Sequence, residues 1–172
     1  QNIALSLART AAEAAVAIVT GDTKVVPRGA ADGLFITTSG VGRILIPGIS
    51  GSAVQPGDRV ILTGSVGDHG TAVMLTREKL LAGEDIVSDT APLTELVLKI
   101  LDAGLPVHAM RDPTRGGVAA AVNEIARQAR VLVEIDETHI PVKPGVAAAC
   151  EALGLEVLQV ANEGKMLLFV AP

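Results

Sequence analysis

From residue 56 onward, short β-type runs alternate with longer helical patterns, and this alternation limits the possible folds more than any other feature. Strands are predicted over 59–64, 106–112 and 131–136, followed by a turn-interrupted pair of strands over 155–171. Helices are predicted over 71–83, 88–104 and 143–154, with another that begins near Gly117. The expected fold is α+β, a layered domain with helices on the faces of a mixed sheet.

The first 50 residues differ in pattern from the rest of the chain. They predict a helix over 2–15, an apolar strand over 16–19 and a β-rich stretch over 34–46. A turn at Pro56, Gly57 and Asp58 marks the boundary, so we expect residues 1–50 to end a preceding domain and residues 55–172 to form the α/β domain. Because the chain opens without Met and inside a helical pattern, we expect a piece of a longer polypeptide.

Composition excludes several classes of protein. Hydrophobic residues make up 49% of the chain but aromatic residues only 1%, so the core must be aliphatic and few rings could stack on nucleobases. The net charge of −5 argues against nucleic-acid binding. The longest apolar runs are too short to span a membrane. A single cysteine, Cys150, gives no intrachain disulfide and favours a cytoplasmic protein.

The motif TGDTKVV, residues 20–26, follows an apolar run and carries an acid and a lysine two positions apart. In such a turn Asp22 can offer a hard oxygen ligand to Mg²⁺, and Lys24 can neutralise a phosphate. From the pattern alone, a surface ion pair between the two residues is the simpler interpretation.

The motif SVGDHG, residues 65–70, is a glycine-flanked loop ahead of a predicted helix. The backbone of Gly67, Asp68, His69 and Gly70 can approach an anion at the start of that helix. The alternative is a tight strand-to-helix turn that needs small residues.

The motif RDPTRGG, residues 111–117, places two arginines at the junction between a predicted strand and a predicted helix. Asp112 or Thr114 can cap the helix, and Gly116 and Gly117 allow a tight turn. Capping does not account for Arg111 and Arg115, whose planar guanidinium groups suit phosphate or carboxylate.

The motif ANEGKM, residues 161–166, places Glu163 in a turn between two apolar strands. A carboxylate that is partly desolvated there can have a raised pKa and act as a base. From the residues alone, a solvated turn acid is the simpler interpretation.

Taken together, the stretches GDTKVVPRGAADG, TGSVGDHGTAVM, SDTAPL, MRDPTRGGVAAAVNEIA and ANEGKM resemble the HypE family of hydrogenase maturation factors. That family belongs to the superfamily of aminoimidazole ribonucleotide synthetase, selenophosphate synthetase and thiamine-monophosphate kinase. The resemblance covers nearly all of the chain, and RDPTRGG together with GDHG separates it from the other branches.

The resemblance implies an ATP-dependent carbamoyl dehydratase. A C-terminal cysteine of the family accepts a carbamoyl group from the carbamoyltransferase HypF, and ATP drives dehydration of the thiocarbamate to a thiocyanate. The cyanide then reaches the [NiFe]-hydrogenase iron through a HypC/HypD complex. The family forms a homodimer whose N-terminal domains hold ATP, with Mg²⁺. Because much of that domain and the cysteine tail are missing here, and Cys150 does not match the acceptor, we expect this chain alone to be inactive.

The resemblance also assigns roles to particular residues. Lys24 and Glu163 match the catalytic residues, and Asp22, Thr23 and Lys24 match the nucleotide-binding position. The wall of the channel that receives the tail would be formed by Arg111, Asp112, Thr114, Arg115, Gly116 and Gly117. Two alternatives stay open: another ATP-dependent synthetase or kinase of the superfamily, and a non-catalytic module that docks onto maturation partners.

Overall fold

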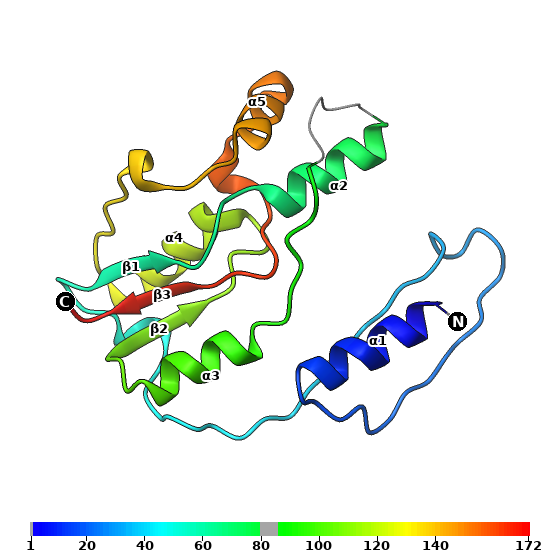
Figure 1. The fold of residues 1–172 in the computed structure, drawn as a ribbon, viewed down its shortest axis with the longest axis horizontal. Coiled ribbons are helices and arrows are strands. Elements are labelled where there is room, and N and C mark those ends of the chain that lie inside the picture. Colours follow the sequence, from blue (N-terminus) through cyan, green and yellow to red (C-terminus); the bar gives the residue numbers. More distant parts are fainter. Residues whose placement is uncertain (1, 80–85) are drawn as a thin grey trace. The chain divides into compact units, whose positions relative to one another are not determined.

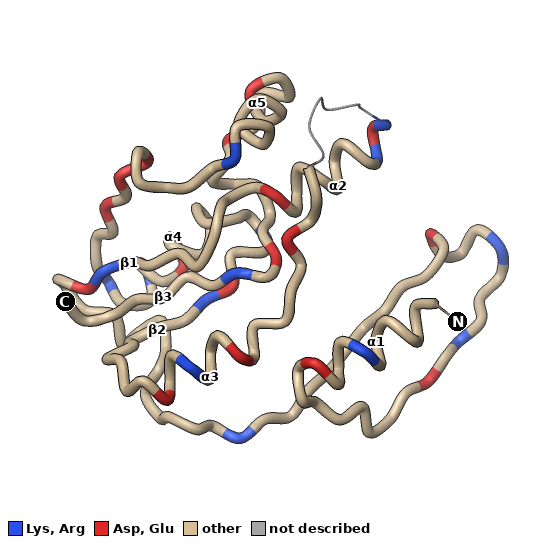
Figure 2. The backbone as a smooth tube through the Cα atoms, viewed as in Figure 1, with Lys and Arg blue, Asp and Glu red and all other residues tan. Residues whose placement is uncertain are grey.

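The computed structural model describes residues 2–79 and 86–172, and the chain divides into two compact units, Gln1–Pro47 and Gly48–Pro172 (Figure 1). Acidic and basic residues are interspersed along both units (Figure 2). Within the described ranges, no helix combines the length and the apolar character needed to cross a bilayer.

The first unit contains one helix, α1 (Asn2–Glu13), followed by a long segment without regular structure. Residues 16–46 form neither helix nor strand, so the strands predicted at 16–19 and within 34–46 are wrong for this structure. A strand is stable only when its backbone groups find partners, and none of the described residues of this unit offers a ladder. Apolar side chains of the predicted strands are consequently exposed, among them Val19, Phe35 and Val41.

The second unit is built on a three-stranded sheet with the order β1-β3-β2. Its strands are β1 (Arg59–Leu62), β2 (Val107–Arg111) and β3 (Leu167–Val170). Both pairings are antiparallel, so the predicted α+β class is confirmed but the mixed sheet expected within it is wrong. The alternation of strands and helices suggested parallel neighbours; instead β3 lies between β1 and β2 and runs opposite to both.

Four α-helices accompany the sheet in the described part of the second unit, and most of them were predicted near their observed bounds. They are α2 (Asp68–Glu78), α3 (Thr94–Asp102), α4 (Gly117–Ala129) and α5 (Pro144–Leu153). Short 3₁₀ turns lie at Gly51–Ala53, Glu137–His139 and Val157–Gln159. The helix stop predicted at Gly83 lies outside the described residues. Helix α3 begins at Thr94 and not at residue 88, so the predicted start of this helix is wrong.

Helix α4 covers one face of the sheet, and its sequence explains why. The buried positions Val118, Ala121, Val122 and Ile125 recur at helical spacing and form one stripe. This stripe joins a core cluster that includes Leu167 and Phe169 of β3. Small aliphatic side chains thus let the helix approach the sheet closely, as the scarcity of aromatic residues requires.

The opposite face of the sheet meets α3. Alternate side chains of a strand point to opposite faces, so Leu168 and Val170 lie on the side away from α4. They cluster with Val107 of β2, and Ile100 of α3 packs against this group. All four residues of β3 are buried, as expected for a central strand with a helix on each side (Figure 1).

The strand predicted at 131–136 is not formed. Val131 and Val133 pack against the α4 core cluster, whereas the side chain of Leu132 is 85% exposed. This alternation is that of a strand, but the segment lacks a ladder partner among the residues the structure describes. Of the pair of strands predicted over 155–171, only Leu167–Val170 forms, and Val157 lies in a 3₁₀ turn.

The start of β1 is fastened to β2 by an ion pair that can be tested through pH. His108 Nδ1 lies 2.7 Å from Asp58 Oδ2, which also accepts a 2.9 Å hydrogen bond from Gln55 N. Burial would raise the pKa of Asp58, but the bonds from Gln55 and His108 outweigh it and the pKa lies below its usual value. Asp58 therefore contributes stability above the unfolded-state pKa of about 4, and this contribution is lost as pH falls through the lower folded-state pKa.

We expect Asp58→Asn to lower the free energy of unfolding at pH 7 by about 1–3 kcal/mol, because a charged buried acceptor is lost. The difference from the unmodified protein should shrink as the pH is lowered from 5 to about 2. Chemical denaturation of the complete protein across this range measures it. Glu95→Gln is the control, because the Glu95–Lys99 pair is fully exposed and its loss should not be measurable. A difference that grows on acidification would contradict the assignment.

Candidate functional site

Three loops that carry sequence motifs meet at one edge of the sheet. Since β1 and β2 both run antiparallel to β3, their carboxyl ends lie beside its amino end, and Leu62 and Arg111 both pair with Leu167. The loops that leave or enter the sheet at this edge are 63–67, 112–116 and 160–166. The structure therefore brings the GDHG, RDPTRGG and ANEGKM motifs together, which no spacing in the sequence indicated.

Asn162 joins the three loops through its side chain. It is fully buried, and its Oδ1 accepts a 2.7 Å hydrogen bond from the backbone N–H of Gly67. Its Nδ2 donates to the carbonyl oxygens of Pro113 at 3.2 Å and Val160 at 2.9 Å. The Asn162 side chain thus links the ANEGKM motif to Gly67 of the GDHG motif and to Pro113 of the RDPTRGG motif, in an interior that water does not reach. The sequence alone did not indicate this role for Asn162.

Two backbone donors of the GDHG loop, those of Gly67 and Gly70, are already engaged. Gly67, at φ +89°, is the N-cap of α2 and donates to Asn162, while Gly70 N donates to Ala161 O at 3.0 Å. The side chain of His69 lies 2.9 Å from Ser88 Oγ through Nδ1. An anion at this loop would therefore need donors other than the Gly67 and Gly70 amides.

Asp68 is buried in an ionic cluster instead of facing outward. Its Oδ1 forms an ion pair with Lys143 Nζ at 2.7 Å, and its Oδ2 accepts from Ser65 Oγ. Burial would raise the pKa of Asp68, but Lys143, Ser65 and the charge of Lys165 together hold it below its usual value. The same contact with Asp68 raises the pKa of Lys143, which lies just before α5.

Lys165 is the residue of this edge that sequence reasoning missed. It is only 4% exposed and contacts two carboxylates, Asp68 and Asp89. The signal that could have found it is a lysine placed directly before the apolar run of β3, where a charge needs buried partners.

In the RDPTRGG loop, the carboxylate of Asp112 organises its neighbours. Its Oδ1 accepts from Arg111 Nη1 at 3.2 Å and its Oδ2 from Thr114 Oγ1 at 3.0 Å. Arg111 also bonds Glu124 of α4 at 2.9 Å. The predicted capping by Asp112 or Thr114 is wrong, because the N-cap of α4 is Gly116. Arg115 is exposed beside this arrangement.

The two glycines of this loop are required for different reasons. Both have positive φ, +72° at Gly116 and +65° at Gly117. A Cβ at Gly117 would lie 2.4 Å from Leu158 O and 2.6 Å from Val160 O, so the helix start rests directly on the backbone that leads to Asn162. At Gly116 the contact would be with the side chain of Ala120.

Glu163 is half-buried at the same edge. Its carboxylate has no hydrogen-bond or ion-pair partner among residues 2–79 and 86–172. Its neighbours are fixed on both sides, by the bonds of Asn162 and by Gly164, which has φ +60°. The arrangement leaves an unengaged carboxylate on a firmly held turn.

Asp22, Thr23 and Lys24 lie in the first unit, in an exposed segment without regular structure. Thr23 N donates to Asp22 Oδ1 at 2.8 Å, and the described ion pairs do not include one between Asp22 and Lys24. No group of three or more possible ligands gathers within the described ranges to hold a metal. Asp22 thus offers a single carboxylate, and a cation held there would need further oxygen ligands from outside the described ranges.

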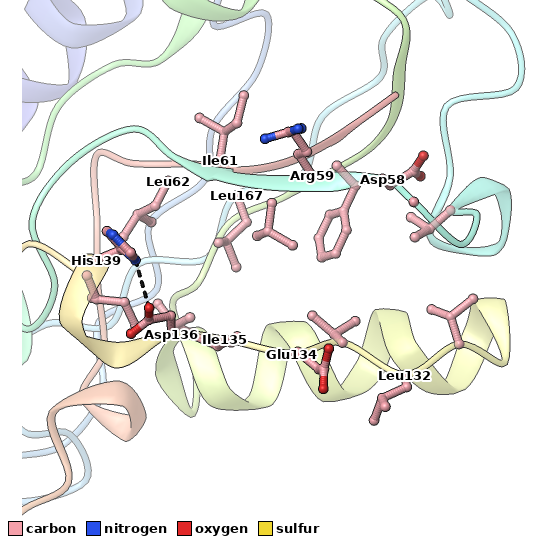
Figure 3. Close-up of a pocket in the computed structure, with 18 of the residues that line it drawn as sticks. Asp58, Arg59, Ile61, Leu62, Leu132, Glu134, Ile135, Asp136, His139 and Leu167 are labelled. Atoms are coloured by element: carbon pink, nitrogen blue, oxygen red, sulfur yellow. Dashed lines mark ion pairs between the residues drawn. The ribbon is translucent and has the colours of Figure 1, made fainter. Parts of the chain in front are cut away.

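A groove of about 800 Å³ lies elsewhere, between β1 and the unpaired segment 131–136. Leu62 and Leu167 point into it, and the His139–Asp136 ion pair lies at one end (Figure 3). The residues that line it include neither arginine of RDPTRGG nor Glu163. This groove and the motif-bearing edge are therefore separate features.

Comparison with known proteins identifies the family. The model of the AIR synthase related protein, C-terminal domain, matches residues 55–172. The chain belongs to the AIR synthase related protein family. Its second unit accordingly corresponds to the C-terminal domain of that family, with the motif-bearing edge inside the matched range.

Within this family the chain is similar to HypE proteins. It is 55% identical to the carbamoyl dehydratase HypE of Rhizobium leguminosarum bv. viciae over 176 residues, covering all of this chain and 50% of that protein. It is 46% identical to the carbamoyl dehydratase HypE of Escherichia coli K12, covering 98% of this chain and 50% of that protein. The chain thus spans about half the length of these relatives. The HypE resemblance predicted from the motifs is confirmed.

The chain is also similar to solved structures of HypE proteins. The crystal structure of the hydrogenase maturation protein HypE in complex with ATP matches with a TM-score of 0.93 and 46% identity, covering 96% of this chain and 50% of that one. A HypE–HypF complex matches with a TM-score of 0.87 and 41% identity, covering 99% and 56%. Thiamine monophosphate kinase from Aquifex aeolicus, at 19% identity and a TM-score of 0.55, covering 72% and 44%, shares the fold alone.

The role of Asn162 predicts a large loss of stability on truncation. Asn162→Ala would leave the buried Gly67 N–H and Val160 C=O without their partner, and we expect a loss of about 3 kcal/mol in the free energy of unfolding. Urea denaturation of the complete protein measures this. Asn123→Ala removes an exposed bond to Ala119 O within α4 and should change stability by less than about 0.5 kcal/mol. Equal effects of the two changes would refute the linking role of Asn162.

The close approach at Gly117 can be separated from its positive φ with a matched pair. Gly154 has the same φ of +65°, but nothing lies within 4 Å of a Cβ there. Gly154→Ala should cost only the left-handed backbone, about 1–2 kcal/mol. Gly117→Ala should cost about 1–3 kcal/mol more, because the added methyl meets the 158–160 backbone. Thermal unfolding of both variants tests this, and similar costs would show that the contact is not tight.

Proposed function

We propose that this chain forms part of an ATP-dependent carbamoyl dehydratase of the HypE type, acting in hydrogenase maturation. The observation that supports the proposal best is its 55% identity, along its whole length, to a carbamoyl dehydratase HypE. The motifs carried by that similarity gather at one sheet edge around Asn162, which is the arrangement expected of a site and not of scattered surface features.

The reaction that fits begins with a thiocarbamate on a C-terminal cysteine tail. Its carbonyl oxygen attacks the γ-phosphorus of ATP, and ADP leaves. One of the two nitrogen-bound protons passes to water at this stage, which leaves a neutral phosphorylated imidate. A base then takes the second nitrogen-bound proton, the nitrogen forms a triple bond to carbon, and the C–O bond breaks to release phosphate. The product is a thiocyanate, which supplies cyanide for the [NiFe]-hydrogenase iron. Phosphorylation is needed because an amide oxygen is otherwise a poor leaving group.

Two residues carry the chemistry in this proposal. Glu163 is the base, since its half-buried carboxylate has no partner within the described residues and is free to take a proton. Lys24, with Asp22 and Thr23, belongs to the nucleotide site and neutralises phosphate charge. Mg²⁺, when bound with ATP, would neutralise more of that charge, and Asp22 would hold it through one oxygen. Cys150 is not the acceptor, because it is buried in a helix.

The RDPTRGG residues form the wall of the channel that receives the tail in this proposal. Arg115 is the arginine that can turn to an incoming carbonyl or phosphate, because Arg111 is already bound by Asp112 and Glu124. Gly116, Gly117 and Thr114 shape the loop that presents it.

The complete protein would be a cytoplasmic homodimer in which residues 1–50 belong to the N-terminal nucleotide-binding domain and residues 55–172 to the C-terminal one. HypF is the proposed carbamoyl donor, supported by the match to a HypE–HypF complex, and a HypC/HypD complex is the proposed acceptor. Another synthetase or kinase of the superfamily is less well supported, because the kinase structure shares only 19% identity. A pure docking module would require no base, so it would not explain why the half-buried carboxylate of Glu163 has no partner within the described residues.

The proposal is tested by ATP-dependent thiocyanate formation on the tail cysteine of the complete protein, followed by mass spectrometry. Lys24→Ala and Glu163→Gln should each slow it by about 100-fold or more. Neither change should alter stability, because Lys24 is exposed and Glu163 is unpaired within the described residues. Lys99→Ala, at an exposed helix position, is the control. Wild-type rates in both variants would reject the proposal, and retained binding of HypF without any ATP dependence would favour the docking module.

A further inference from the structure

We propose that Lys165 is a positioning residue: it locks the Asn162–Lys165 turn onto the segment 88–91 and so holds Glu163 in place. This inference rests on the proposed function, because it takes Glu163 as the base. It also gives a role to the SDTAPL motif, which the sequence linked to the family without assigning it a task.

The first argument is the burial of charge. Lys165 is 4% exposed and Asp68 is 1% exposed, and Lys165 Nζ lies 3.5 Å from Asp68 Oδ2. Nζ also contacts Asp89 Oδ2, on a side chain that is 15% exposed. An ammonium in such a place is stable only with carboxylates around it, and removing one member leaves another charge buried. The lysine therefore joins three segments: the start of α2, the approach to α3, and the turn before β3.

The second argument is backbone contact. A Cβ at Gly164 would lie 2.1 Å from Asp89 O and 2.7 Å from Ala91 N, so the turn lies directly against the 88–91 backbone. The stem of Lys165 passes beside Gly64, where a Cβ would lie 3.4 Å from Lys165 Cε. Side chain and backbone of the turn are thus enclosed from two directions.

The third argument is that segment 88–91 is itself held. Ser88 Oγ lies 2.9 Å from His69 Nδ1 and 2.8 Å from Thr90 Oγ1. The GDHG loop thus anchors one end of the segment through His69, while Asp68 of the same loop reaches Lys165. The turn that carries Glu163 therefore packs against a segment that is itself held by hydrogen bonds.

These contacts matter for catalysis because Glu163 has no partner of its own in the described part of the chain. Its position depends on its neighbours in the turn. Asn162 is bonded to the other two loops, and Lys165, which follows Gly164, is held by the ion pairs. A base must come within about 3 Å of the proton it takes, and a misplacement of about 1 Å can cost about 100-fold in rate.

The test uses the complete protein with Lys165→Met, which removes the ammonium and keeps an unbranched stem, and Lys165→Arg, which keeps a cation. Both are also made in the Glu163→Gln background. Asp58→Asn is the matched control, because it breaks a buried ion pair at the opposite edge of the same sheet. If Lys165→Met does not fold, Asp89→Asn replaces it, since Asp89 is the more exposed partner.

We expect Lys165→Met to lower kcat for thiocyanate formation by about tenfold or more, with KM for ATP within about twofold. Lys165→Arg should recover most of the rate. In the Glu163→Gln background, Lys165→Met should cause no further loss, because the residue it positions is already absent. The inference is overturned if Lys165→Met behaves like Asp58→Asn at equal folded fraction, or if its full effect persists without Glu163.

Hydrogen exchange provides a readout independent of activity. Backbone amides of 88–91 and 162–165 should exchange about tenfold faster or more in Lys165→Met but not in Asp58→Asn. Unchanged exchange in both segments rejects the lock whatever the activity. A wild-type rate in Glu163→Gln would instead reject the proposed base, so the two failures are told apart.

Discussion

The buried amide of Asn162 is the interaction on which the arrangement of this protein's second unit depends. It is the only kind of side chain that could serve there, since it must accept from one backbone N–H and donate to two carbonyls at once. Aspartate could not donate, and leucine could do neither. Because the site is fully buried, each of these bonds replaces one that water would otherwise make, and the three loops are held in a single relative arrangement.

The order of the strands creates the place where Asn162 acts. With β3 between β1 and β2, two strands end where one begins, and both neighbouring loops open toward the residues that precede β3. The glycines then decide how closely these loops can pack. Gly117 lets the start of α4 touch the 158–160 backbone, and Gly164 lets the next turn touch segment 88–91. Polar contacts and close backbone packing thus support the same geometry.

Local pattern predicted those parts of the fold whose stability is local. Helix α4 has its apolar stripe and its glycine start in the sequence itself, and α5 has a proline at its first position. Strands β1 and β2 follow turn signals. The segment 131–136 has the same alternation, yet it forms no strand, because alternation reports a half-buried surface and not the presence of a ladder partner. The strand predicted within 34–46 of the first unit is absent for the same reason.

The candidate site shows the same limit. The motifs identified the loops, but which residues meet across them depends on contacts nearly one hundred positions apart, as between Asp68 and Lys165. Asp89 falls within the helix predicted over 88–104, but it lies before α3 and its carboxylate forms an ion pair with a lysine in another loop. A short polar side chain near a helix start has both uses open to it, and only the tertiary fold selects one.

The central place of β3 has a consequence for how the protein is made. β1 and β2 share no hydrogen bonds with each other in the described structure; both are joined through a strand that follows them by more than fifty residues in the sequence. During synthesis, β1 and β2 leave the ribosome before β3, so neither can form its native hydrogen bonds until residue 170 has emerged. Sheet formation, the Asn162 link and the Lys165 cluster all await the same late segment, so assembly of this unit should be slow and non-local, with its helices forming first.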